Sequence, residues 1–461
     1  MQVTIMKKRL FKGGMVVSSR GIKKNDILVA GDRIIAVGRN IKEDAEIIDV
    51  TGKLLFPGFI DAHTHFDLEV SDTVTADRFE TGTKSAIAGG VTTVVDFATQ
   101  NKGETLSEAL NNWHMKAFAN SSCDYAFHMA ISDWREDVKE ELCAMFEQGV
   151  TSFKLYMTYP AMMLSDKEIF DILTELKNLG GIAGCHCENA GIIDGLRERF
   201  VSEEKLSPLY HPLSRPATCE AEAVDRFLRI SEAVECPVIV VHLSTEEGLK
   251  EIRRARGRGA QVFVETCPQY LLLEDGVYDN DFDEAAKFIC SPPIRKKQDR
   301  KALWRALKDG EIQTVSTDHC SFTKEQKRAG QYDFRRIPNG MPGVETRPIL
   351  LYTYGVKKKR ISLSQMCALL CENPAKLYGM YPKKGVIKVG ADADIVVFDP
   401  HAHSVISAEN QHSACGYTPY EGVKVSGEIE SVWLRGEPVC RDGEIIKEHF
   451  GRYVSRGKPE L

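Results

Sequence analysis

Short apolar segments alternate with polar, helix-like segments through the middle of the chain, and this alternation limits the folds available to it. The predicted strands are Leu54–Ile60, Val91–Ala98, Tyr125–Ile131, Val150–Met157, Ile182–Glu188, Val238–Ser244, Gln261–Thr266 and Ile312–Asp318. Helical spacing occurs between them, as in Ser165–Leu179, with Ser165 as the predicted cap and Glu168 three residues later, and in Ala221–Val234. Eight such units predict a (β/α)8 TIM-like barrel, with insertions at Arg197–Thr218 and Leu271–Arg300.

The two ends of the chain have a different pattern, in which short strand-like segments are separated by tight turns. A few strands at each end can complete one sheet domain together. We therefore predict an α/β protein in which residues 1–53 and 385–461 form a smaller discontinuous β-sandwich and residues 54–384 form the barrel. The segments are Met15–Val17, Asp26–Val29, Arg33–Gly38, Val386–Val389, Asp394–Phe398 and Val432–Arg435.

The composition argues against several classes of protein. A net charge of −6 over 461 residues is unlike a nucleic-acid-binding surface. No stretch approaches the ~20 apolar residues that a membrane helix needs. The thirteen cysteines are scattered without framework spacing, which indicates reduced thiols and a cytoplasmic location. Two of them, Cys185 and Cys187, flank His186 in a predicted strand and are expected to face packing helices.

Side chains that bind metals occur at the ends of the predicted strands. His63 and His65 follow the first strand and, being two residues apart, point to the same face. In a barrel of this kind the active site lies at the carboxyl ends of the strands. Four further residues occupy such positions on the fourth, fifth, sixth and eighth strands: Lys154, His186, His242 and Asp318. The sequence therefore predicts one metal centre.

Lys154 is unusual because a lysine inside a buried apolar strand is costly to desolvate. One interpretation is an ion pair within the barrel. The other is that burial and metals lower its pKa, so that the neutral amine adds carbon dioxide and becomes an N6-carboxylysine. The four histidines and the aspartate around it favour this second interpretation, because the two oxygens of a carbamate can bridge two cations.

Two divalent ions can then be shared among six residues. His63, His65 and Asp318 hold one ion, His186 and His242 hold the other, and carboxylated Lys154 bridges them. Imidazole and oxygen ligands predict zinc, with manganese or cobalt as substitutes. Two metals ~3.5–4 Å apart activate water and polarise the carbonyl that it attacks.

The chain resembles the dihydropyrimidinase and D-hydantoinase group of the amidohydrolase superfamily, and in particular D-phenylhydantoinase-like enzymes. The resemblance covers essentially the whole chain. Its specific motifs are Phe56–His65, Ser152–Tyr159, His186–Asn189, His211–Pro216, Val241–Ser244, Glu265–Tyr270, Ser291–Arg295, Thr317–Cys320 and Pro338–Glu345.

This resemblance implies further roles in the site. Tyr159 matches the tyrosine whose hydroxyl stabilises the oxyanion as the ring opens. Ser291 and Asn339 match positions whose backbone groups bind the cyclic diamide. Asp318 is the expected general base and then acid. His319 is not expected to be a ligand. Relatives form homotetramers or dimers, and a homotetramer is favoured.

The implied reaction is metal-dependent opening of a cyclic diamide, a 5-substituted hydantoin or a dihydropyrimidine, to an N-carbamoyl amino acid. The partner is then a small molecule, with no nucleic acid or membrane involved. The alternatives are an allantoinase or a dihydroorotase, and a non-catalytic dihydropyrimidinase-related scaffold. Dihydroorotases typically carry an arginine two residues after the His-x-His motif, where this chain has Asp67, which would repel a carboxylate. The scaffold proteins have lost metal ligands, whereas this chain keeps all six.

Overall fold

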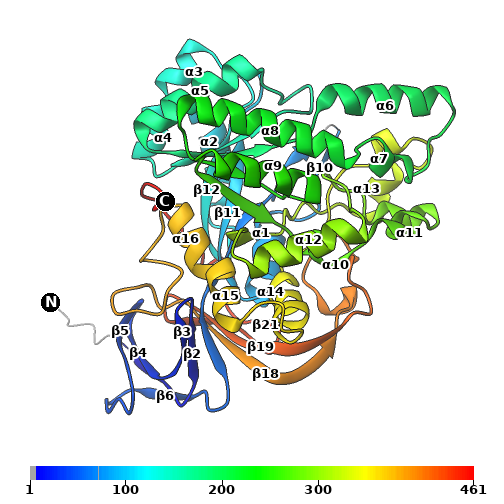
Figure 1. The fold of residues 1–461 in the computed structure, drawn as a ribbon. Helices are drawn as coiled ribbons and strands as arrows, with labels where there is room; N and C mark the ends of the chain where they lie inside the picture. The colour runs from blue at the N-terminus through cyan, green and yellow to red at the C-terminus, as the bar shows by residue number, and fades with distance from the viewer. Residues whose placement is uncertain (1–6, 71) are drawn as a thin grey trace.

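The structure, a computed structural model, describes residues 7–70 and 72–461 and contains the predicted barrel. Eight parallel strands form one sheet in simple sequence order, with helices on the outside (Figure 1). The strands are β8 (Phe59–Thr64), β11 (Val91–Thr99), β12 (Asp124–Ala130), β13 (Ser152–Tyr156), β14 (Ile182–His186), β15 (Val238–Val240), β16 (Val262–Thr266) and β17 (Thr314–Val315).

The first and last barrel strands, β8 and β17, are not paired directly, and contacts near their carboxyl ends link them. Thr64, the last residue of β8, forms a parallel bridge with His319 beyond β17, and the His65 amide donates to the His319 carbonyl at 2.8 Å. The fully buried guanidinium of Arg347 donates to the carbonyls of Ile60 and Val315, at 2.9 and 2.8 Å. These contacts connect β8 and β17, which strand pairing leaves unconnected.

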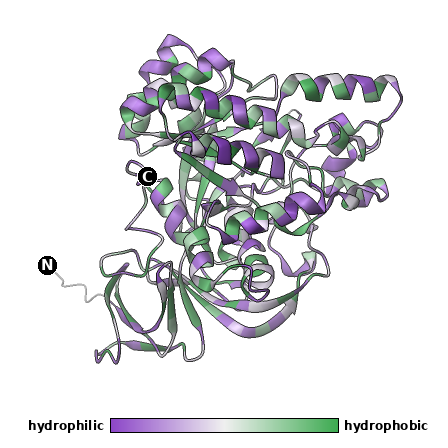
Figure 2. Cartoon of the chain, viewed as in Figure 1, coloured by the Kyte–Doolittle hydropathy of each residue, from purple (hydrophilic) through white to green (hydrophobic). Residues whose placement is uncertain are grey.

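The helices around the barrel present apolar residues inward and polar residues outward, and the central strands are largely apolar (Figure 2). Helix α5 (Asp166–Leu179) begins after Ser165 with the predicted Ser165–Glu168 capping box. Helix α8 (Ala217–Val234) begins earlier than predicted. The other α-helices are α1 (Phe79–Ala88), α2 (Leu106–Ala117), α3 (Glu136–Glu140), α4 (Leu142–Glu147), α6 (Ala190–Ser202), α7 (Tyr210–Leu213), α9 (Glu246–Gly257), α10 (Pro268–Leu272), α11 (Phe282–Ala286), α12 (Lys297–Lys308), α13 (Lys324–Arg328), α14 (Arg347–Leu351), α15 (Leu363–Cys367) and α16 (Asn373–Leu377).

The two ends of the chain form the predicted β-sandwich below the barrel in Figure 1. One sheet has the order β5-β4-β1-β6 and the other β21-β20-β19-β18-β7-β2-β3, and side chains of both sheets, such as Phe11 and Trp433, share one apolar core. The strands are β1 (Lys8–Lys12), β2 (Met15–Ser18), β3 (Gly21–Lys24), β4 (Asp26–Ala30), β5 (Arg33–Gly38), β6 (Glu46–Asp49), β7 (Leu54–Pro57), β18 (Ile395–Val405), β19 (Lys424–Leu434), β20 (Glu437–Arg441) and β21 (Glu444–Ile445). A separate two-stranded ribbon pairs β9 (Glu69–Val70) with β10 (Thr73–Val74).

Two predicted strands differ from the structure. Leu54–Ile60 is not one strand, because β7 pairs with β18 and β2 of the sandwich whereas β8 begins the barrel. Gly58 separates β7 from β8. The chain passes so close to Thr92 here that a Cβ at position 58 would lie 2.0 Å from Thr92 Oγ1. Val386–Val389 is irregular, although Val386 and Ile387 pack against the sandwich core. The domain boundaries at 53/54 and 384/385 remain predictions.

A buried ion network joins the sandwich to the barrel. The Lys384 ammonium lies 2.6 Å from carboxylate oxygens of Asp124 and Asp394 and 3.0 Å from one of Asp392. Asp124 also pairs with the Arg435 guanidinium. Asp124 begins barrel strand β12, whereas Asp394 and Arg435 flank sandwich strands β18 and β19, so the network fixes the two parts against each other.

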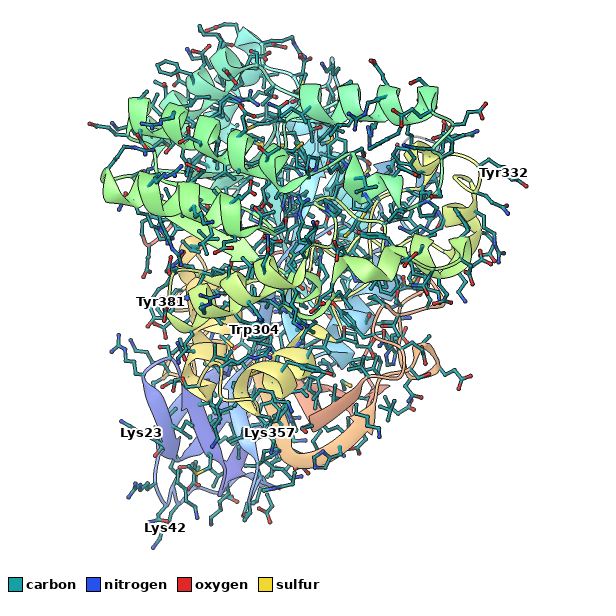
Figure 3. The ribbon with its side chains drawn as sticks, turned by 45° about the vertical axis from the view of Figure 1, so that its right-hand side comes forward. Lys23, Lys42, Trp304, Tyr332, Lys357 and Tyr381 are labelled. Carbon is teal, nitrogen blue, oxygen red and sulfur yellow. The ribbon has the colours of Figure 1, made fainter. Side chains whose placement is uncertain are left out.

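The β-sandwich lies at one end of the molecule, below the barrel in the view of Figure 1. In Figure 3, Lys23 and Lys42 mark the exposed surface of the sandwich, and Tyr332 projects from the barrel on the opposite side. No helix in the described ranges combines the length and apolar character that crossing a membrane requires.

Candidate metal centre

The six predicted ligands lie at or near the carboxyl ends of barrel strands. His63 is the second-last residue of β8, with His65 just beyond its end; Lys154 is the middle residue of β13; and His186 ends β14. His242 and Asp318 follow β15 and β17 by two and three residues. All six side chains are buried or nearly so. The fold therefore brings together residues that are up to 255 positions apart in the sequence.

Nitrogen and oxygen atoms converge at the centre of this group. Asp318 Oδ1 lies 3.1 Å from the Nε2 atoms of both His63 and His65. One ligand atom each of His63, His242 and Asp318 lie within 4.8 Å of one another. The imidazole rings of His242 and His186 have centroids 4.6 Å apart. This donor set of imidazoles and a carboxylate fits zinc, manganese or cobalt.

Lys154 shares the interior of this group. Its side chain is 1% exposed, and Nζ lies 3.5 Å from His63 Nε2. It forms no ion pair with any carboxylate in the described part of the chain. Burial lowers the pKa of the Lys154 ammonium, against the opposing effect of Asp318 and Glu265. The structure therefore lacks the internal ion pair that would make Lys154 a purely structural residue.

Asp318 remains ionised in this setting. Burial alone would raise the pKa of its carboxyl, but the His63 and His65 imidazoles hold that pKa well below its ordinary value. The Nδ1 atom of His242 finds no hydrogen-bond partner among the described residues. An ionised carboxylate beside imidazoles with unused nitrogen atoms is the arrangement that divalent cations bind.

Three of the residues at the strand ends have left-handed backbone conformations although none is glycine. The φ angles are 69° at Tyr159, 39° at His242 and 54° at Asp318. Such conformations cost about 1–3 kcal/mol each and persist only where the surrounding structure imposes them. The barrel therefore holds these side chains against a local backbone preference.

A second layer of charged residues, which sequence reasoning did not identify, orients the imidazoles. Glu265 Oε1 lies 2.6 Å from His63 Nδ1 and 3.3 Å from the amide nitrogen of His242. A hydrogen bond from Nδ1–H of His63 to Glu265 leaves Nε2 of His63 free to face Asp318. The available signal was an acidic residue at the end of an otherwise apolar strand, here β16.

His186 has a comparable support. Its Nε2 lies 2.7 Å from Glu188 Oε2, and Arg215 donates to the same oxygen at 2.5 Å. Burial would raise the pKa of Glu188, but the Arg215 guanidinium and His186 bring it down to about 2. Glu188 is thus a permanent acceptor that fixes the His186 ring. The flanking thiols of Cys185 and Cys187 belong to the apolar core, as predicted.

The predicted substrate-binding residues border the centre. The Tyr159 ring lies 5.2 Å from the His186 ring, and burial raises the pKa of its phenol. Ser291 is a neighbour of the Tyr159 hydroxyl, and its own hydroxyl has no partner among the described residues. Asn339 lies in the segment 338–340, which pairs with the segment before Ser291 through the Gly340 amide and the Ile289 carbonyl, at 2.9 Å.

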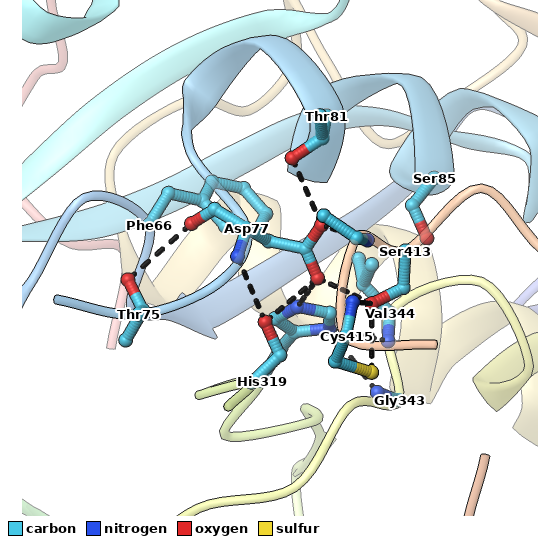
Figure 4. A network of polar contacts seen from close by, with 12 residues as sticks. Phe66, Thr75, Asp77, Thr81, Ser85, His319, Gly343, Val344, Ser413 and Cys415 are labelled. Atoms are coloured by element: carbon cyan, nitrogen blue, oxygen red, sulfur yellow. Dashed lines mark hydrogen bonds and ion pairs between the residues drawn. The ribbon is translucent and has the colours of Figure 1, made fainter. Parts of the chain in front are cut away.

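Both ring nitrogens of His319 have hydrogen-bond partners within the protein. Its Nε2 lies 2.9 Å from Asp77 Oδ2, and its Nδ1 accepts from the amides of Gly343 and Val344 (Figure 4). Asp77 also accepts from Ser413 and from the Ala414 amide. His319 therefore ties the residue after Asp318 to the segment 413–415 and to the loop after Gly340.

Asp67 occupies the position where dihydroorotases typically carry an arginine. Its carboxylate accepts from the Phe79 amide at 2.8 Å, at the beginning of α1. A negative charge is favourable at the start of a helix. The expectation that Asp67 would repel a substrate carboxylate stays a prediction.

The comparisons with known proteins agree with this geometry. Residues 54–439 match the family described as the amidohydrolase family. The chain belongs to this family. It is 44% identical to the D-hydantoinase of Geobacillus stearothermophilus, over 98% of this chain and 97% of that protein. It is 38% identical to the D-phenylhydantoinase of Escherichia coli O1:K1, over 97% of this chain and 98% of that protein.

Solved structures give the same result. A dihydropyrimidinase from Brevibacillus agri NCHU1002 superposes with a TM-score of 0.97 at 41% identity, covering 98% of this chain and 99% of that one. An L-hydantoinase from Arthrobacter aurescens superposes with a TM-score of 0.89 at 30% identity, covering 98% of this chain and 100% of that one. The predicted fold, family and class of enzyme, a cyclic amidohydrolase, are therefore confirmed.

Proposed function

We propose that the protein opens the ring of cyclic diamides, namely 5-substituted hydantoins and dihydropyrimidines, and releases N-carbamoyl amino acids. The observation that carries this proposal is the convergence of His63, His242 and Asp318 around the buried Lys154 at the mouth of the barrel. The names of the most similar relatives support the substrate class.

The residues present suit two divalent ions, and zinc is the metal we propose. His63, His65 and Asp318 would hold one ion and His186 and His242 the other, with Lys154 carboxylated on Nζ to supply two bridging oxygens. Two such ions supply an activated water and a polarised carbonyl. No carboxylate among the described residues forms an ion pair with the Lys154 amine. This supports the modification, because an ion pair would have been the alternative reason for burying a lysine here.

Asp318 and Tyr159 would move and stabilise charge during the reaction. Water adds to the ring carbonyl, the ring C–N bond breaks, and the departing nitrogen takes up a proton. Ionised Asp318 accepts the proton of the water and returns it to that nitrogen. The phenol of Tyr159, kept protonated by burial, donates to the oxygen on which negative charge develops.

The backbone groups of Ser291 and Asn339 would hold the cyclic diamide. A ring with alternating N–H and C=O groups needs acceptors and donors in a fixed arrangement. Two neighbouring backbone segments, joined through Gly340 and Ile289, can provide them. This recognition uses no charged side chain, which suits a neutral ring better than dihydroorotate.

We propose that the D-enantiomer of a 5-substituted hydantoin is preferred. The relatives named D-hydantoinase are 38–44% identical to this chain, whereas the L-hydantoinase is 30% identical and superposes less closely. We also propose a homotetramer, by analogy with the family, and a cytoplasmic location. The thirteen cysteines are all free in the structure, which supports the location.

A hydrolysis panel tests the function. Purified protein should hydrolyse hydantoin, dihydrouracil and D-5-phenylhydantoin, turn over the L-enantiomer more slowly, and leave allantoin and dihydroorotate largely unchanged. Dihydroorotate as the best substrate would refute the proposal, as would an active preparation without bound metal. Light scattering tests the tetramer.

A further inference from the structure

Helix α13 contains a buried lysine that has no part in the proposed chemistry. The Lys327 side chain is 2% exposed, although both neighbours, Gln326 and Arg328, reach solvent to some degree. Its Nζ donates to three backbone carbonyls, at 2.9 Å to Ile289, 2.7 Å to Pro338 and 2.8 Å to Gly340. An ammonium group has three N–H donors, so each has one acceptor.

No opposite charge balances this ammonium. Lys327 forms no ion pair with any carboxylate in the described part of the chain, and the titratable groups that face it are the thiols of Cys290, Cys320 and Cys415. Burial lowers the pKa of the Lys327 ammonium to about 8. A buried unpaired charge costs stability, and oriented carbonyls offset that cost only in part. Its position therefore calls for a reason other than stability.

The three carbonyls belong to two segments of the proposed substrate site. Ile289 lies two residues before Ser291, and Pro338 and Gly340 lie on either side of Asn339. The segments also pair directly, from the Gly340 amide to the Ile289 carbonyl at 2.9 Å. Gly340 also lies directly against a third segment, since a Cβ at this position would lie 2.1 Å from the Cys320 carbonyl oxygen. The Lys327 side chain thus binds both the segment before Ser291 and the segment around Asn339.

We propose that Lys327 is a positioning residue that sets the distance between the backbone groups of Ser291 and Asn339 and so determines affinity for the cyclic diamide. This inference rests on the proposed function. Lys327 itself touches neither the ring nor the metal centre. Its ammonium acts indirectly, because it binds the three backbone carbonyls and so holds the two segments together.

The first test compares two lysine-to-methionine variants on the same helix. Lys327→Met keeps most of the side-chain length but removes all three donors, whereas Lys324→Met makes the same change at an exposed position. We expect Lys327→Met to raise KM for D-5-phenylhydantoin about 10-fold, with kcat within about 3-fold and unchanged metal content, since losing one well-placed hydrogen bond to the ring weakens binding about 10-fold. Lys324→Met should match the unchanged protein. An unchanged KM in a folded Lys327→Met protein overturns the proposal.

The second test needs no variant. Below its pKa of about 8, Lys327 offers three donors to three carbonyls, and above it the amine offers two. KM of the unchanged protein should therefore rise as the pH increases through about 8. Burial holds the pKa of Cys290 and Cys415 higher, at about 12 and 11, and that of Cys320 higher still, so these thiols stay neutral there. His211, which contacts the Cys290 carbonyl, has its pKa lowered well below the ordinary value and stays neutral as well.

Hydrogen exchange separates failure of this inference from failure of the proposed function. Peptides covering residues 286–292 and 336–343 should exchange faster in Lys327→Met than in Lys324→Met, whatever the substrate proves to be. If exchange is faster in Lys327→Met but the unchanged protein hydrolyses no hydantoin, the proposed function is refuted and the positioning role of Lys327 is supported. Unchanged exchange in Lys327→Met would overturn the positioning role. If Lys327→Met could not be purified, a KM of the unchanged protein that does not vary between pH 7 and 9 would overturn it instead.

Discussion

Replacing Lys154 tests the metal centre most sharply. Lys154→Arg keeps a positive charge but cannot form a stable carbamate, and its larger guanidinium would lie against His63, which is already 3.5 Å from Nζ. Lys154→Ala removes the group and leaves a cavity beside the histidines. If carboxylated Lys154 bridges two ions, both variants lose one ligand to each ion.

The size of the effect follows from the position of Lys154 at the centre of the ligand group. Losing an outer-shell partner of a metal ligand typically weakens metal binding 10–100-fold, about 1.4–2.8 kcal/mol, and loss of an inner ligand should exceed this. We expect fewer than two ions per chain and a fall in kcat of at least ~10³-fold, about 4 kcal/mol in activation free energy. Lys102→Arg, at an exposed position, is the matched control and should change neither quantity.

The assay combines metal analysis with hydrolysis of D-5-phenylhydantoin, with and without added acetate. Acetate can enter the cavity of Lys154→Ala and supply two oxygens, so partial recovery is expected for this variant and none for Lys154→Arg. A structural ion-pair role predicts the opposite order, with Lys154→Arg tolerated and no effect of acetate. A fully active, metal-loaded Lys154→Arg protein would refute the carbamate.

Three further predictions concern single side chains. Tyr159→Phe should lower kcat ~10²–10³-fold at unchanged metal content, with exposed Tyr332→Phe as the control; near-normal turnover would limit Tyr159 to shaping the pocket. Glu265→Gln should weaken metal binding ~10–100-fold because His63 loses its charged partner, and metal titration that gives an unchanged affinity would contradict this. Lys384→Met should cost about 3–5 kcal/mol in denaturant unfolding, because three buried carboxylates lose their cation. The three aspartates raise the pKa of Lys384 above its ordinary value despite burial. The charged Lys384 therefore contributes to the free energy of unfolding throughout the range below pH 10.5, and the loss caused by Lys384→Met should be equal at pH 6 and pH 9.

The sequence alone determined the architecture where the signals are local. Apolar strands and capped helices repeat in a fixed order, so the barrel and the start of α5 after Ser165 follow from neighbouring residues. The candidate ligands could be identified for a related reason. In a barrel the carboxyl ends of all the strands meet at one face, so residues at those ends share a site whatever their separation in sequence.

Tertiary structure decided the features that depend on distant partners. Leu54–Ile60 looks like one apolar strand, but its first half pairs with Val396 and Phe398 of the sandwich. The sequence pattern did not indicate that the Asp67 carboxylate accepts from the Phe79 amide at the start of α1.

The supporting roles of the charged residues likewise did not follow from the pattern, although Glu265, Glu188 and Arg215 lie within the specific motifs. Glu265 and Glu188 orient imidazoles, Arg215 holds Glu188, and Lys327 joins two loops, because the folded chain removes water around them and leaves only protein partners. A sequence reports the type and spacing of a residue. Which buried hydrogen bonds a side chain must satisfy is determined when the barrel closes around it.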